Sequence, residues 1–138
     1  MPLDDCKFID LPKISDPRGN LTFIEGGYHI PFDIRRVYYL YDVPAGADRG
    51  AHAHKNLTQL IVPLAGSFDI ILDDGIKKKT FHLNRPFLGL LIYPMMWRVL
   101  DNFSSGAVCM VLASDYYDVS DYYRDYDEFL KDARQVTK

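Results

Sequence analysis

Two features are scarce in this sequence, and each shortage excludes a class of protein. Basic residues are outnumbered, with 16 Lys and Arg against 19 Asp and Glu and a formal net charge of -3. A nucleic-acid-binding protein needs clustered cations for the phosphate backbone, so we expect no nucleic-acid partner. No apolar run approaches the roughly 20 residues of a membrane helix, so we also expect no membrane partner.

Cysteines and signal-peptide features are equally sparse. Cys6 and Cys109 are the only cysteines, and they lack the CxxC spacing of redox or metal sites. Free thiols are typical of a reducing compartment, although the sequence leaves a disulfide between the two open. The segment MPLDDCKFIDLPK carries acids where a signal peptide carries positive charge, and it has no apolar core. We therefore expect a cytoplasmic protein.

The length and composition of the chain are those of a single β domain. Its 138 residues suffice for a single core and are too few for two comfortable ones, so we predict one domain over residues 1–138. Aromatic and β-branched residues favour strands, and turn formers separate the candidate segments. The expected strands are residues 8–12, 21–25, 34–43, 57–64, 68–72, 77–83, 88–93, 97–100 and 107–113. Short strands without intervening helices predict an all-β fold, either an antiparallel sandwich or a barrel.

The end of the chain departs from this pattern. Apolar and aromatic residues recur there at helical spacing, with Ser120 as a plausible N-cap and Asp121 in the first turn. The stripe consists of Tyr122, Tyr123, Tyr126, Phe129 and Leu130. We therefore predict an amphipathic C-terminal α-helix over about residues 119–134, packed on the β domain or on a partner subunit.

The segment from Gly46 to Gly66 contains half of the four histidines of the chain. Side chains alternate faces along a strand, so His52 and His54 should point into the same space, and the small alanines beside them leave room for a ligand. Three interpretations are open for this pair: metal ligands, satisfied core histidines, or proton carriers. Imidazole donates or accepts a proton near neutral pH, which favours the third.

The spacing within this segment resembles the first motif of the cupins. The chain follows that motif with Gly46, then five residues, His52-x-His54, four residues, Gln59, six residues and Gly66. The resemblance implies a double-stranded β-helix, or jelly roll, with His52, His54 and Gln59 pointing inside. A cupin metal site would use a carboxylate in place of Gln59 and a further histidine after a second motif, which MMWRVLDNF lacks. Two imidazoles and a neutral amide are a poor ligand set, so we expect no metal.

A narrower resemblance covers nearly the whole chain. This chain is similar to the sugar-nucleotide 3,4-ketoisomerases in four segments, which are RRVYYLYDVPAG, RGAHAHKNLTQ, ILDDG and VLASDYYD. The resemblance implies a metal-free jelly roll that needs no cofactor. It also implies a homodimer with exchanged N-terminal strands. The implied reaction converts dTDP-4-keto-6-deoxyglucose to dTDP-3-keto-6-deoxyhexose.

The chemistry of that reaction assigns roles to three side chains. A ketone moves from C4 to C3 when the C3 proton is removed, an enediol forms and C4 is protonated, so acid-base groups suffice. By resemblance, His52 and His54 are the catalytic pair and Tyr38 is the third member; either histidine could be the base. Alternation separates Tyr38 from Tyr39 and leaves open which of the two faces inward.

Arginines are the expected partners of the substrate diphosphate, because the guanidinium group pairs with phosphate oxygens. We select Arg18, in the turn SDPRGN, together with Arg98 and Arg49, and we place Gln59 in the substrate-binding set. In the family, the positions of Arg18 and Arg98 vary between enzymes that give gluco and galacto products. This chain has arginine at both positions, so both configurations at C4 stay open.

Two other classes of function remain as alternatives. One is a metal-dependent cupin enzyme. The other is a non-catalytic sugar-binding cupin module, which would need a signalling or DNA-binding partner domain.

Overall fold

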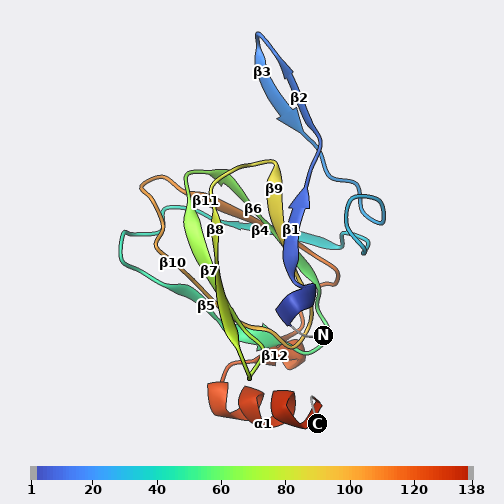
Figure 1. Cartoon of the computed structure of the whole chain (residues 1–138), viewed down its shortest axis with the longest axis vertical. Helices are drawn as coiled ribbons and strands as arrows, with labels where there is room; N and C mark the ends of the chain where they lie inside the picture. Colours follow the sequence, from blue (N-terminus) through green and yellow to red (C-terminus); the bar gives the residue numbers. More distant parts are fainter. Residues whose placement is uncertain (1–2, 137–138) are drawn as a thin grey trace.

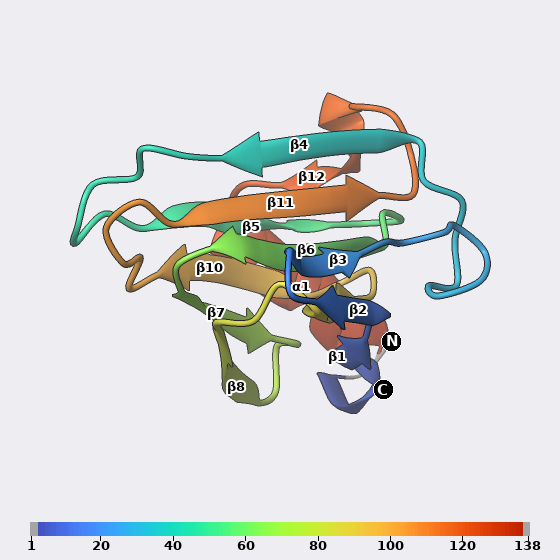
Figure 2. The ribbon, with the colours of Figure 1, turned by 90° about the horizontal axis from the view of Figure 1, so that it is seen from above.

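Two five-stranded antiparallel sheets make up the body of the computed structural model, which describes residues 3–136 (Figures 1 and 2). The first sheet has the order β1 (Lys7–Asp10), β9 (Leu88–Ile92), β6 (Gln59–Ala65), β11 (Val108–Ala113) and β4 (Arg36–Leu40). The second has the order β12 (Tyr122–Tyr123), β5 (Arg49–His54), β10 (Trp97–Asp101), β7 (Phe68–Asp73) and β8 (Lys78–Leu83). The prediction of an all-β sandwich is confirmed, with most strands shifted by one to three residues.

The main core lies between the sheets. Phe68, Ile70 and Leu72 alternate along β7 and are fully buried, whereas Asp69 and Ile71 between them are partly exposed. This is the two-residue period of a strand with one face on the core. Strands β6 and β9 are instead buried on both faces, because loop residues such as Ile30 cover the outer face of the first sheet. Their uninterrupted apolar runs follow from this double burial.

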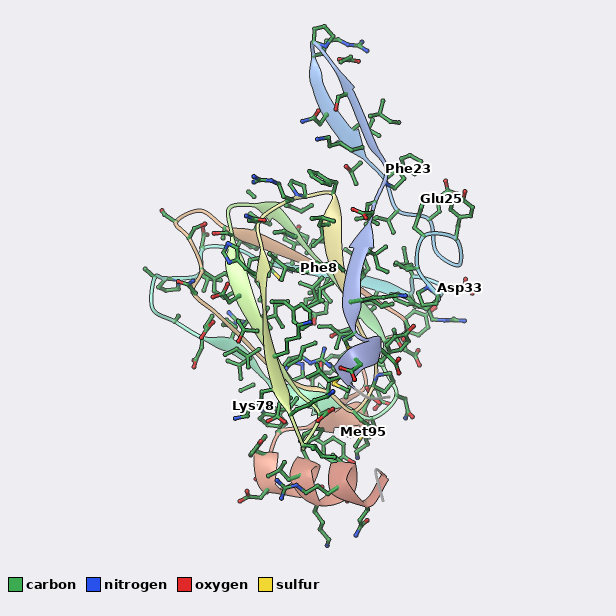
Figure 3. All side chains as sticks on the ribbon, in the orientation of Figure 1. Phe8, Phe23, Glu25, Asp33, Lys78 and Met95 are labelled. Carbon is green, nitrogen blue, oxygen red and sulfur yellow. The ribbon has the colours of Figure 1, made fainter. Side chains whose placement is uncertain are left out.

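An N-terminal hairpin projects from the body (Figures 1 and 3). It consists of β2 (Lys13–Asp16) and β3 (Gly19–Thr22), which pair only with each other within residues 3–136. Phe23 lies where the hairpin joins the body, and the side chains of Ile14 and Leu21 are exposed on it. The predicted strand over residues 21–25 is therefore displaced toward the N-terminus, while the predicted turn that presents Arg18 is confirmed.

The C-terminal helix exists but begins later than predicted. Helix α1 spans Tyr126–Val136, not residues 119–134. The 3-10 turn η2 (Val119–Asp121) precedes it, with Asp118 rather than Ser120 as its N-cap, and then β12 pairs with Ala53 and His54 of β5. Aromatic residues suit strands as well as helices, so pairing with β5 overrides the helical pattern of residues 122–123. The helix packs next to Met95, at the end of the sandwich opposite the hairpin (Figure 3).

The structure also describes the state of the two cysteines and the lengths of the helices. Cys6 and Cys109 are both buried and free, so the disulfide left open by the sequence does not form. The Sγ atom of Cys6 accepts a hydrogen bond from the backbone N–H of Tyr93 at 3.5 Å. Within the described part of the chain, no helix is long and apolar enough to span a membrane.

Gly66, between β6 and β7, lies where the backbone packs closely against Ser104 and Ala107. Its φ is +68°, and an added Cβ would lie 2.5 Å from Ser104 Oγ and 2.9 Å from Ala107 Cα. The left-handed backbone costs about 1–2 kcal/mol for a side-chain-bearing residue, and overpacking typically adds about 1–3 kcal/mol. We expect Gly66→Ala to lower the free energy of unfolding in urea by the sum of both terms.

Gly106→Ala is the matched control for that substitution. Its φ is +74°, but an added Cβ would meet nothing within 4 Å, so this variant should show only the backbone term. Equal urea midpoints for the two variants would contradict the close packing at Gly66.

Candidate active site

A cavity of about 540 Å³ lies between the two sheets and is lined mainly by β4, β5, β6 and β10. It contains five of the seven predicted site residues: Tyr38, Arg49, His52, Gln59 and Arg98. Four residues that the sequence did not suggest complete the polar lining: Arg36, Tyr117, Tyr122 and Arg124. The cavity therefore combines imidazole, phenol and guanidinium groups in one space.

The two histidines of β5 meet at their Nε2 atoms. These atoms lie 3.1 Å apart, and the rings are nearly perpendicular, at 89°. Both side chains point to the interior, as the alternation predicted, but only His52 lines the cavity. His54 is fully buried behind it, and its Nδ1 lies 3.0 Å from Asp121 Oδ2. His52 is therefore the member of the pair that faces the cavity, and His54 lies behind it.

Burial and nearby cations keep both imidazoles neutral. Burial, followed by the charge of Arg98, lowers the pKa of His52 to about 3 and that of His54 to about 2. The charge of Arg124 acts in the same direction on both rings. The carboxylate of Asp121 opposes these effects at His54, because it hydrogen-bonds the protonated Nδ1. At neutral pH each ring is therefore uncharged and has one nitrogen with a free lone pair.

A chain of hydrogen bonds orients Tyr38 on the opposite sheet. Arg98 is fully buried and donates from Nη1 to Gln59 Oε1 and from Nη2 to the carbonyl of Met96, at 3.1 Å for the latter. Because guanidinium only donates, Gln59 must turn its oxygen to Arg98 and its Nε2 to Tyr38, whose Oη accepts at 3.1 Å. The hydroxyl proton of Tyr38 is then free to point into the cavity.

The protonation states of this chain fit that arrangement. Burial raises the pKa of Tyr38 above its usual value, so the phenol keeps its proton at neutral pH. Burial lowers the pKa of Arg98 to about 10, which still leaves the guanidinium charged. Tyr38 is therefore a hydrogen-bond donor to whatever occupies the cavity.

The same contacts make the site unsuitable for a metal ion. The only oxygen of the Gln59 amide is occupied by a guanidinium, so a cation there would lie next to a fixed positive charge. Within residues 3–136, no group of three or more His, Cys, Asp or Glu could hold a metal. The donor set fits proton transfer better than metal binding.

The other predicted arginines lie in different places. Arg49 is exposed at the edge of the cavity. Arg18 is at the tip of the β2–β3 hairpin, with a 90% exposed side chain that pairs with Asp16 at 2.7 Å. Arg18 is therefore outside the cavity formed by its own chain.

Two of the arginines that the sequence did not suggest are held against tyrosines. The guanidinium of Arg36 lies over Tyr38 at 5.3 Å and over Tyr117 at 5.5 Å, and its buried Nε has no hydrogen-bond partner. Arg124 lies 4.3 Å over the ring of Tyr122. Alternation along β4 could have placed Arg36 on the face of Tyr38. Arg124 was missed because its segment was predicted to be helical.

Comparison with known proteins gives a consistent result. The model of the FdtA family, described as WxcM-like, C-terminal, matches residues 4–134. A TDP-4-oxo-6-deoxy-alpha-D-glucose-3,4-oxoisomerase from Aneurinibacillus thermoaerophilus is 50% identical over 125 residues, which are 91% of this chain and 90% of that protein.

Solved structures agree with the sequence match. The sugar 3,4-ketoisomerase QdtA from Thermoanaerobacterium thermosaccharolyticum, in complex with TDP, has a TM-score of 0.96 at 42% identity and covers 99% of this chain and 100% of its own. A histidine-to-asparagine mutant of that enzyme has been solved with TDP-4-keto-6-deoxyglucose. The TDP-quinovose 3,4-ketoisomerase WlaRB from Campylobacter jejuni has a TM-score of 0.89 at 50% identity and covers 94% of this chain and 99% of its own.

Proposed function

This chain belongs to the cupin-type TDP-sugar 3,4-ketoisomerases, and from that premise we propose that it converts TDP-4-keto-6-deoxyglucose to TDP-3-keto-6-deoxyhexose without a metal. One observation carries the mechanism: a neutral His52 and the hydroxyl of Tyr38 line the same cavity. We place the reaction in the cytoplasm, in keeping with two free thiols.

The reaction balances without a redox cofactor. His52 takes the C3 proton, and the electrons of the C3–H bond form a double bond to C4. The carbonyl electrons move to the C4 oxygen, which takes a proton from Tyr38. The enediol then returns the proton of its C3 hydroxyl to the ionised Tyr38 and receives at C4 a proton from His52, which leaves the ketone at C3 and both side chains in their starting states. Oxidation at C3 equals reduction at C4, so acid-base groups suffice.

Cations at the edge of the cavity support binding of the diphosphate. Arg36 has an unused buried Nε, and Arg49 and Arg124 are exposed beside it. Guanidinium groups pair well with phosphate oxygens. Arg98, which the sequence suggested for this contact, donates its hydrogen bonds to Gln59 and Met96. It acts instead by orienting Gln59, which in turn orients Tyr38. We therefore assign the diphosphate first to Arg36, and Gln59 to the orientation of Tyr38.

We also propose the homodimer with exchanged N-terminal strands. The β2–β3 hairpin exposes Ile14 and Leu21 and projects from its own body, as a segment that packs on a second subunit would do (Figure 1). Exchange would carry Arg18 from its own chain toward the cavity of the partner. Sedimentation equilibrium of the intact chain tests this, and a monomer at micromolar concentration would contradict it.

Turnover by chelator-treated protein separates this function from its alternatives. We expect protein dialysed against EDTA to convert TDP-4-keto-6-deoxyglucose to a 3-keto product, identified by NMR, at the rate of untreated protein. Activity lost on chelation and restored by one metal per subunit would indicate a metal-dependent enzyme. Binding of the TDP-sugar without turnover would indicate a non-catalytic module.

A further inference from the structure

We propose that Asp121 is a positioning residue that makes His52 and His54 a single proton-holding pair, with the accepting nitrogen on His52 Nδ1. This inference rests on the proposed ketoisomerase function. It assigns a part to a carboxylate that lies outside the cavity lining and does not touch the substrate.

The carboxylate of Asp121 is held in place by the segment that follows β5. Its Oδ1 accepts the backbone N–H of Asn56 at 2.8 Å, and its backbone carbonyl accepts the N–H of Lys55 at 2.8 Å. These contacts leave Oδ2 aimed at His54 Nδ1, 3.0 Å away. The carboxylate is 13% exposed and the imidazole is fully buried, so little water competes for this hydrogen bond.

This contact determines the tautomers of both rings. A carboxylate only accepts, so His54 carries its proton on Nδ1. The Nε2 of the neutral His54 ring is then an acceptor, and it faces His52 Nε2 at 3.1 Å. His52 must therefore be the donor of that hydrogen bond, with its proton on Nε2. Its Nδ1 keeps a free lone pair and lies beside Gly50, which lines the cavity.

The pair can move positive charge away from the cavity when the base accepts a proton. The C3–H bond breaks and an N–H bond forms at His52 Nδ1, while the Nε2 proton of His52 passes to His54 Nε2. The positive charge then rests on His54, next to the carboxylate of Asp121. Arg98 and Arg124 repel positive charge on both rings, but only His54 has a carboxylate in contact with it, at 3.0 Å, so this contact is what favours the transfer. The reverse transfer returns a proton from His52 Nδ1 to C4.

Asp121→Asn tests this proposal because the introduced side chain has only one possible orientation. Its oxygen must still accept the Asn56 N–H, so its amide nitrogen would face His54 Nδ1. That nitrogen donates, which forces the proton of His54 onto Nε2 and the proton of His52 onto Nδ1. We expect kcat to fall about 10²–10⁴-fold, as for an aspartate-to-asparagine exchange behind another catalytic histidine. KM should stay within about threefold.

Asp118→Asn is the matched control. Asp118 caps the same 3-10 turn through Ser120, and asparagine caps as well as aspartate. This variant should keep the kcat of the wild type. A fall in kcat equal to that of Asp121→Asn would show that only the turn matters and would overturn the proposal.

Imidazole ¹⁵N NMR gives a readout that a merely structural role would not change. We expect wild-type His54 to be protonated at Nδ1 and the Asp121→Asn variant to be protonated at Nε2. Wild-type His54 protonated at Nε2 would overturn the inference even if the variant did not fold, as would an unchanged kcat in a folded variant. The wild-type spectrum does not depend on turnover, so absence of the ketoisomerase reaction would contradict the proposed function separately.

Discussion

Replacement of His52 by asparagine is expected to lower kcat by about 10²–10⁴-fold, the usual contribution of a positioned acid-base group. His52 is the member of the histidine pair that lines the cavity, and its neutral ring is the group available to take the C3 proton. Asparagine is shorter and cannot accept a proton at neutral pH. The diphosphate contacts lie elsewhere, so KM should change little. Initial rates from NMR of the 3-keto product measure the effect.

His82→Asn is the control for this substitution. His82 lies on β8, is exposed and pairs with Asp69 at 2.6 Å, outside the cavity. It should keep the wild-type kcat, and both variants should retain the circular dichroism spectrum of the wild type. A folded His52→Asn variant with kcat within about threefold of the wild type would remove His52 from the mechanism.

Tyr38→Phe is expected to lower kcat about 10²-fold or more, because the variant lacks the proton donor for the C4 oxygen. The loss also leaves Gln59 Nε2 without its partner in a buried position. An unsatisfied buried donor costs about 1–3 kcal/mol, so the urea midpoint should fall as well. Steady-state kinetics and urea unfolding measure the two effects separately.

Tyr39→Phe offers a control from the same strand. Tyr39 is the next residue of β4, and it is 60% exposed on the opposite face. Removal of its hydroxyl should change neither kcat nor the urea midpoint. If the two variants behaved alike in both measurements, the inward hydroxyl of Tyr38 would have no special role.

The sequence contained enough information for the fold class and for the inward face of β5. Two-residue alternation placed His52 and His54 on one side, and turn formers such as Gly75 marked the strand ends. The same rule could not tell the two histidines apart. His54 is covered because Tyr122 of β12 pairs with it and Asp121, 67 residues further along the chain, contacts its ring. Such long-range pairing is not encoded in local periodicity.

The helical spacing of the C-terminal aromatic residues led to a wrong prediction for the segment that completes the site. Residues 119–134 were predicted to form one helix, and a helix would have pointed Asp121, Tyr122 and Arg124 in directions set by its own axis. The strand β12 instead brings Tyr122 within 4.4 Å of the His54 ring centroid. The hydrogen bond from Arg98 to Gln59 could not be predicted for a related reason, since it forms only once the two sheets face each other.

Turnover in deuterated water tests the central claim most directly. The protein is incubated with TDP-4-keto-6-deoxyglucose in D₂O, and the position of deuterium is read by NMR in the wild type and in His52→Asn. Proton transfer through the His52–His54 pair predicts a 3-keto product with deuterium at C4 for the wild type, and no deuterium at C3 or C4 for the variant. Deuterium at C5, or at C4 at equal rates in both proteins, would contradict the account.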